Sequence, residues 1–61
     1  MPNRIYRLQE VQERTGLGRS TIYRLEAKGE FPARIKLSER AVGWHSAAID
    51  SWIESRISDA A

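Results

Sequence analysis

Residues 15–29 of this 61-residue chain read TGLGRSTIYRLEAKG, and this stretch decides the fold that we predict. Gly16 is a natural stop for a helix that ends at Thr15, because glycine adopts a left-handed backbone conformation without strain. Leu17 is an apolar residue that can hold the turn on the core, and a second helical pattern follows at once over 19–28. Two helices joined by so short a turn indicate a helix–turn–helix.

The segments on either side of this motif complete the predicted domain. Residues 8–15 are good helix formers with acidic residues near their start, which is typical of a two-turn helix. Apolar and polar residues alternate over 34–37 and again over 42–44, which predicts two short strands joined by the polar connection 38–41. Ser46 can cap a last helix whose apolar stripe consists of Ile49, Trp52, Ile53 and Ile57.

The predicted fold class is therefore α+β, mainly α. We expect a small winged helix–turn–helix with two N-terminal helices, a two-stranded β-hairpin wing and a C-terminal helix. A chain of 61 residues has room for one domain, here 1–61 with an ordered core at about 5–57. In so small a domain both tryptophans, Trp44 and Trp52, are expected to be buried, where they hold the hairpin to the last helix.

Composition restricts the chemistry that the chain can perform. The chain contains no cysteine and only one histidine, His45, so neither a thiolate zinc site nor a nucleophile pair can be assembled. We therefore expect no catalysis, no cofactor and no metal. No stretch approaches the ~20 apolar residues that cross a bilayer, and no apolar signal segment follows the N-terminus, so we expect a cytoplasmic protein without a membrane partner.

Charge is distributed unevenly along the chain. Residues 1–40 hold nine Lys or Arg against five Asp or Glu, whereas residues 41–61 hold one Arg against three acids. This asymmetry favours a basic face for a polyanion, although surface solubility alone is an alternative explanation. The first helix is preceded by Arg4 and Arg7, for which phosphate contact and simple solvation both remain open.

The exposed side of helix 19–28 suits contact with DNA. Ile22 and Leu25 define its buried side at 100° per residue, and Glu26 falls near the core edge. Arginine can bond both acceptors on a guanine edge, and hydroxyls can reach bases or phosphates. We therefore expect this helix to enter the major groove of double-stranded DNA. The residues offered for this contact are Arg19, Ser20, Thr21, Tyr23, Arg24 and Lys28.

Alternatives remain for three of these residues. Tyr23 can instead pack on the hairpin as a half-buried ring, and Arg24 can be merely solvated. Thr21 lies toward the core flank, which favours packing or a first-turn hydrogen bond over a base contact. In the hairpin, outward-facing Arg34 and Lys36, with Arg40 at the bend, would form a basic wing that contacts phosphates. Charges that merely protect an edge strand are an equal alternative.

The order of these motifs resembles the AlpA family of phage-type transcriptional regulators, which is related to excisionases and to MerR-like winged-helix proteins. The resemblance spans residues 5–57, and family members typically carry serine in place of Gly18 and often glycine near Ser38. It is carried by Arg7-Leu8-Gln9-Glu10-Val11, Thr15-Gly16-Leu17-Gly18-Arg19-Ser20-Thr21-Ile22-Tyr23-Arg24, Phe31-Pro32, Val42-Gly43-Trp44 and Ile49-Asp50-Ser51-Trp52-Ile53.

This resemblance implies a regulator of a prophage or mobile element that binds promoter or attachment-site DNA. An excisionase acting at attachment sites is one alternative, and a protein-binding adaptor without DNA contact is another. A single module of this size buries little surface on DNA, so repeated sites and a homodimer or cooperative multimer are expected. No small-molecule substrate is expected.

Overall fold

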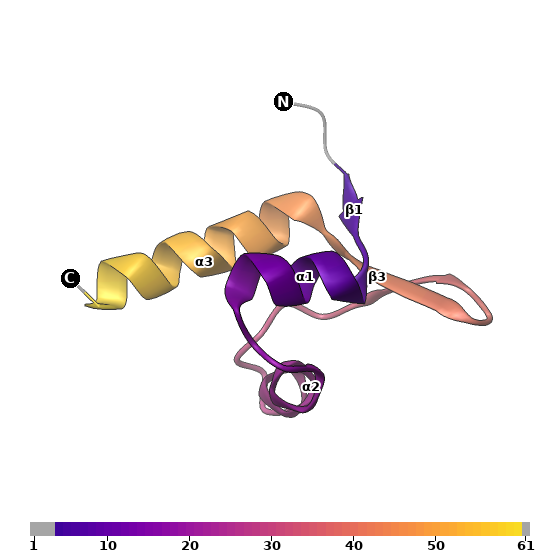
Figure 1. Cartoon of the computed structure of the whole chain (residues 1–61), viewed down its shortest axis with the longest axis horizontal. Coiled ribbons are helices and arrows are strands. Elements are labelled where there is room, and N and C mark those ends of the chain that lie inside the picture. The colour runs from indigo at the N-terminus through magenta and orange to yellow at the C-terminus, as the bar shows by residue number, and fades with distance from the viewer. Residues whose placement is uncertain (1–3, 61) are drawn as a thin grey trace.

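The computed structural model describes residues 4–60 and contains three helices and a three-stranded antiparallel sheet. The predicted α+β, mainly helical class is confirmed, and the arrangement is that of a small winged-helix-like fold (Figure 1). In chain order the elements are β1 (Ile5–Tyr6), α1 (Leu8–Thr15), α2 (Arg19–Ala27), β2 (Ile35–Ser38), β3 (Ala41–His45) and α3 (Ser46–Ala60).

Backbone conformation at two glycines sets the helix–turn–helix. Gly16 has a φ of 74° and its N–H donates to the carbonyl of Gln12, which ends α1 as predicted. Gly18 is the extended N-cap residue of α2, with φ −79° and ψ 164°. The connection between the helices therefore contains only three residues, and Leu17 within it packs against the core, as predicted. α2 ends at Ala27, one residue before the predicted end.

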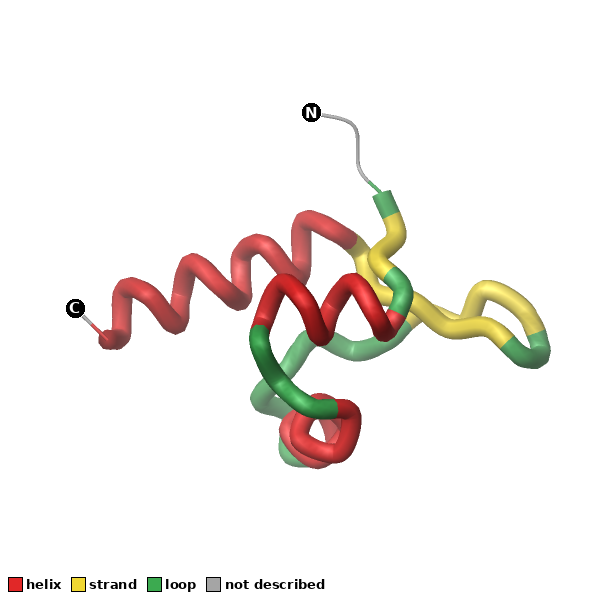
Figure 2. The backbone as a smooth tube through the Cα atoms, viewed as in Figure 1, coloured by secondary structure: helices red, strands yellow, loops and turns green. Residues whose placement is uncertain are grey.

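The sheet has the strand order β1-β3-β2, and β1 is an element that the sequence did not reveal. Ile5 pairs with His45 and Tyr6 with Trp44, so the chain ahead of α1 joins the edge of the hairpin. Two residues are too few to show alternation, which is why the pattern gave no sign of this strand. The hairpin projects from the body at one end, as the tube in Figure 2 makes plain.

The core lies between the helices and one face of the sheet. Trp44 is fully buried, and its ring meets those of Tyr23 and Phe31 at 6.3 and 6.4 Å between centroids. Its indole N–H donates to the carbonyl of Pro32 at 3.0 Å, so the one polar atom of the ring is satisfied. The buried apolar residues are Tyr6, Val11, Ile22, Phe31, Trp44 and Ile49.

Trp52 departs from its prediction, because it is half-buried rather than buried. Its ring packs on Phe31 at 4.9 Å between centroids, and its indole N–H donates to the carbonyl of Glu30 at 2.8 Å. The indole nitrogen thus lies at the protein surface, where the loop after α2 supplies the acceptor. These two contacts fasten the last helix to the loop after α2, whereas the predicted contact of Trp52 was with the hairpin.

The hairpin is turned the opposite way from the predicted orientation. Ile35 pairs with Gly43 and Lys36 with Val42, and directly paired residues share a face of an antiparallel sheet. Lys36 therefore shares the face of Val42 and Trp44, whereas Ile35 and Leu37 belong to the other face and are 39% and 43% exposed. Alternation of apolar and polar residues predicts that a strand has two different faces, but not which face packs against the core. Here the core face is the one that carries the buried Trp44.

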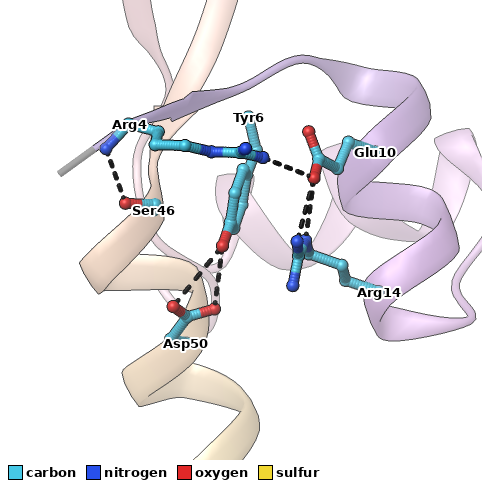
Figure 3. A network of polar contacts seen from close by, with 6 residues as sticks. All are labelled: Arg4, Tyr6, Glu10, Arg14, Ser46 and Asp50. Atoms are coloured by element: carbon cyan, nitrogen blue, oxygen red, sulfur yellow. Dashed lines mark hydrogen bonds and ion pairs between the residues drawn. The ribbon is translucent and has the colours of Figure 1, made fainter. Parts of the chain in front are cut away.

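A polar network fastens β1, α1 and α3 together (Figure 3). The backbone N–H of Arg4 donates to the hydroxyl of Ser46, and the Ser46 N–H donates to the Arg4 carbonyl. The guanidinium groups of Arg4 and Arg14 both bond Glu10, and the Tyr6 ring lies within 5.2 and 4.3 Å of them. The hydrogen bond to Glu10 raises the pKa of Arg14, which stays charged.

Candidate nucleic-acid interface

One side of α2 is exposed along its whole length. Ile22 is fully buried on the opposite side, and Leu25 packs against the core cluster beside it. At 100° per residue, Ser20, Arg24 and Ala27 fall in an arc centred opposite Ile22, and Arg19 and Lys28 flank this arc. In Figure 1 this helix is seen end-on, and α1 lies between it and β1. The exposed residues of the arc and its flanks are Arg19, Ser20, Arg24, Ala27 and Lys28.

Thr21 and Tyr23 are half-buried at the borders of this exposed side. The Tyr23 ring packs against the core on Trp44, so the packing role that we left open for this side chain is present. The Arg19 guanidinium lies 5.9 Å from the Tyr23 ring centroid. Within residues 4–60 the Tyr23 hydroxyl makes no hydrogen bond. Its ring is thus structural, while its hydroxyl stays available to a ligand.

Arg34 is the one predicted wing residue that the structure places elsewhere. It precedes β2 and turns back onto α2, where its backbone N–H donates to Glu26 at 2.6 Å and its guanidinium pairs with the same carboxylate. The guanidinium also lies 5.3 Å from the Tyr23 ring centroid. Glu26 is only 11% exposed, which confirms its expected place at the core edge. Its charge draws Arg34 inward, so Arg34 does not project outward from the hairpin.

Lys36 and Arg40 are exposed on the hairpin. Lys36 and Trp44 lie on the same face of the sheet, and the ring of Tyr23 from α2 packs against Trp44 on that face. Lys36 therefore belongs to the same side of the molecule as α2. Arg40 lies in the turn between the strands, where its backbone N–H donates to the Ser38 hydroxyl at 3.4 Å.

The ten cationic side chains divide into two equal groups according to their partners. Five bind acceptors within the chain: Arg4 and Arg14 bind Glu10, Arg34 binds Glu26, Arg7 donates to the Val42 carbonyl, and Arg56 donates to the Glu30 carbonyl. The other five make no side-chain hydrogen bond or ion pair within residues 4–60. They are Arg19, Arg24, Lys28, Lys36 and Arg40; the sequence predicted DNA contact for all five, and also for Arg34, which belongs to the first group.

Other kinds of site receive no support from the described part of the chain. Across residues 4–60, no group of three or more His, Cys, Asp or Glu side chains could hold a metal ion. Among the helices of the same residues, none combines the length and the hydropathy that crossing a bilayer requires. Arg4 and Arg7, whose role was open, bind Glu10 and the Val42 carbonyl respectively.

Comparison with known proteins gives one family and two relatives. The sequence model of the family described as Prophage CP4-57 regulatory protein (AlpA) matches residues 4–57. Protein ORF88 of Enterobacteria phage P4, described as uncharacterized, is 43% identical over 54 residues, which cover 88% of this chain and 61% of the phage protein. The DNA-binding transcriptional activator AlpA of Escherichia coli strain K12 is 39% identical over 61 residues, which cover 87% of this chain and 84% of that protein.

Proposed function

Because this chain belongs to the AlpA family of prophage regulatory proteins, we propose that it binds double-stranded DNA sequence-specifically and regulates transcription of a phage or mobile element. The E. coli relative is named a DNA-binding transcriptional activator, which favours transcription over excision as the task. The proposed activity is binding without catalysis.

The observation that carries the proposal is that some cationic side chains bind acceptors within the protein whereas the others stay free. A free cation strengthens binding to DNA because its contact with a phosphate releases counterions from the duplex. A cation that is already paired with a carboxylate adds little to this binding free energy. The five cations without a partner in residues 4–60 lie on α2, at its C-cap and on the hairpin, and Lys36 belongs to the face of the sheet against which Tyr23 of α2 packs. These elements can therefore touch one duplex together.

Base reading is assigned to the exposed arc of α2. Arg24 lies near its centre and can bond both acceptors of a guanine edge, while Ser20 and Arg19 reach neighbouring positions from the first turn. The Tyr23 hydroxyl and Lys28 contact phosphates at the sides of this arc. Thr21 is half-buried and supports the first turn of the helix by packing. Ala27 keeps the helix surface low enough for close approach to the groove.

The hairpin supplies backbone contacts through Lys36 and Arg40. In contrast to the expected wing, Arg34 is assigned to the base of α2 rather than to the hairpin, because Glu26 already binds it. Lys36 takes part because the strand register directs it to the side of the sheet on which α2 packs.

A salt-dependence experiment tests this assignment. Duplexes enriched from a random library by repeated binding to the purified chain would be titrated at several salt concentrations, with the K36A/R40A variant alongside. Loss of two phosphate contacts lowers the slope of log affinity against log salt by about 2. The R4A/R56A variant removes the same charge from cations already bound within the protein, so its slope should match the wild type.

Two results would reject parts of the proposal. An unchanged slope for K36A/R40A would remove the hairpin from the interface. Weak binding that is blind to sequence even at low salt would remove sequence-specific recognition altogether and favour an adaptor that binds protein.

A further inference from the structure

Large apolar side chains are exposed at two places in the described residues. Ile5, Ile35 and Leu37 are 38%, 39% and 43% exposed, and Ile57 is 59% exposed. The first three form what we call the apolar sheet face. The strand register places Ile5 and Ile35 on the face of Gly43, and a Cβ atom built at Gly43 would contact Ile5 and lie 3.3 Å from Leu37. Glycine at this position thus lets Ile5 and Leu37 close over the central strand.

The apolar sheet face is turned away from the proposed DNA-binding side. Trp44 and Lys36 occupy the other face, against which Tyr23 of α2 packs. A sheet whose two faces differ in this way normally buries the apolar one, and exposed apolar clusters mark contact surfaces. A protein that covered this face would leave α2 and Lys36 open to a duplex.

The second place is the end of α3, which we call the α3 tip and define as residues 54–60. The apolar stripe of this helix loses contact with the body step by step: Ile49 is fully buried, Ile53 is half-buried and Ile57 is 59% exposed. Figure 1 shows the reason, since the C-terminal turns of α3 leave the body at the end of the molecule opposite the hairpin. Ile57 is therefore an apolar side chain presented on a protruding helix.

Charge makes these two places complementary. Around the apolar sheet face, Arg40 in the turn and Arg7, which bonds β3, outnumber the single acid Glu39. The α3 tip carries Glu54 and Asp59 against Arg56, and the negative end of the helix dipole adds to it. Two sheet faces meeting each other would bring like charges together, whereas an α3 tip meeting a sheet face brings opposite charges together.

We propose that the apolar sheet face binds the α3 tip of a second copy of this chain, with Ile57 seated against Leu37 and Ile35. Because the two surfaces lie at opposite ends of one molecule, the contact is head-to-tail and does not close on itself. Three side chains offer far less than the roughly 800 Å² per partner of a stable complex, so the free protein associates weakly, with a dissociation constant on the order of 0.1–1 mM.

The contact becomes important when the protein is bound to DNA, and this role rests on the proposed function. Copies bound at neighbouring sites on one duplex are at millimolar effective concentration, which is enough to fill a weak contact. Each bound copy then presents a free end for the next copy, and repeated sites are filled cooperatively.

Sedimentation equilibrium of the full chain without DNA, from about 10 μM to 1 mM, tests the contact separately from DNA binding. The Leu37→Glu variant sets an acid against the acidic α3 tip, and the Ile57→Lys variant sets a cation against the basic hairpin. Each variant alone should associate roughly tenfold more weakly than the wild type. The Ser58→Lys variant adds the same charge beside the stripe but keeps Ile57, so it should weaken association by less than Ile57→Lys does, and circular dichroism verifies that every variant is folded.

Mixing the two variants gives the decisive result. The Leu37→Glu chain keeps an intact α3 tip and the Ile57→Lys chain keeps an intact sheet face, so the mixture should associate with wild-type strength through this one intact pair of surfaces. A wild type that stays monomeric at 1 mM overturns the proposal. So does a mixture that does not associate, and so does an Ile57→Lys chain that associates normally, which would mean that two sheet faces pair.

Discussion

Replacing Glu26 with glutamine removes the charge that holds Arg34 against α2. Glu26 accepts two hydrogen bonds from Arg34, one from the backbone N–H at 2.6 Å and one from the guanidinium. A hydrogen bond to a charged group contributes about 1.5–3 kcal/mol, but the Arg34 side chain is 48% exposed and solvent screens much of it. Glutamine also retains one acceptor. We therefore expect the free energy of unfolding to fall by about 1 kcal/mol.

The same variant is expected to bind DNA more tightly, whatever the sequence of the duplex. Arg34 lies beside the Tyr23 ring, which Arg19 also approaches, at the border of the proposed interface, and once released it becomes a sixth free cation there. One additional phosphate contact steepens the slope of log affinity against log salt by about 0.9. Affinity for random duplex and affinity for an enriched site should therefore rise by the same factor.

Urea denaturation followed by circular dichroism measures the first effect, and fluorescence anisotropy with random and enriched duplexes measures the second. The Glu13→Gln variant is the matched control, since it makes the same charge change at an exposed position of α1. It should leave both stability and salt slope close to the wild type. If Glu26→Gln matched this control in both measurements, the idea that Glu26 withholds Arg34 from DNA would be wrong.

Three further predictions concern the scaffold. Trp44→Phe loses the hydrogen bond to the Pro32 carbonyl and leaves a gap in the core, so urea denaturation should show a loss of about 2–3 kcal/mol; a loss below about 0.5 kcal/mol would contradict the packing described. In Gly16→Ala the added methyl group would touch no neighbouring atom, but alanine would be forced to a φ of 74°. The melting temperature should therefore fall by roughly 4–8 °C. An unchanged melting temperature would mean that the turn does not need glycine. Gly43→Ala would push Ile5 from the central strand and should cost about 1 kcal/mol, less than a rigid core site would because Ile5 is exposed; a neutral result in the same denaturation assay would contradict the close approach.

Local signals in the sequence predicted the elements well where they repeat over several residues. The helices follow from apolar periodicity and, for α1 and α2, from the glycines that come after them, and Gly16 has the conformation that its position predicted. The two-residue strand β1 has no period of its own and forms because β3 offers an edge to pair with. Whether so short a segment forms a strand depends only on a pairing partner that is distant in the sequence.

Orientation and pairing were harder to predict because they depend on contacts distant in sequence. Alternation separated Lys36 from Ile35 but could not say which side the body covers, and the burial of Trp44 on the neighbouring strand decides it. Arg34 belongs by sequence to the hairpin, yet an acid eight residues earlier binds it. The exposed side of α2 was predictable since a single buried residue, Ile22, fixes the phase of the helix.

The central claim, that the exposed arc of α2 reads base pairs, is tested most directly at Arg24. Binding of the wild type and of Arg24→Ala would be measured on an enriched duplex and on a set in which each base pair is changed in turn. The variant should lose about 1–3 kcal/mol on the enriched duplex and become indifferent to the base at one position, while its preferences elsewhere persist. An equal loss on every duplex would show that Arg24 grips only phosphate, and no loss on any duplex would place recognition outside this arc.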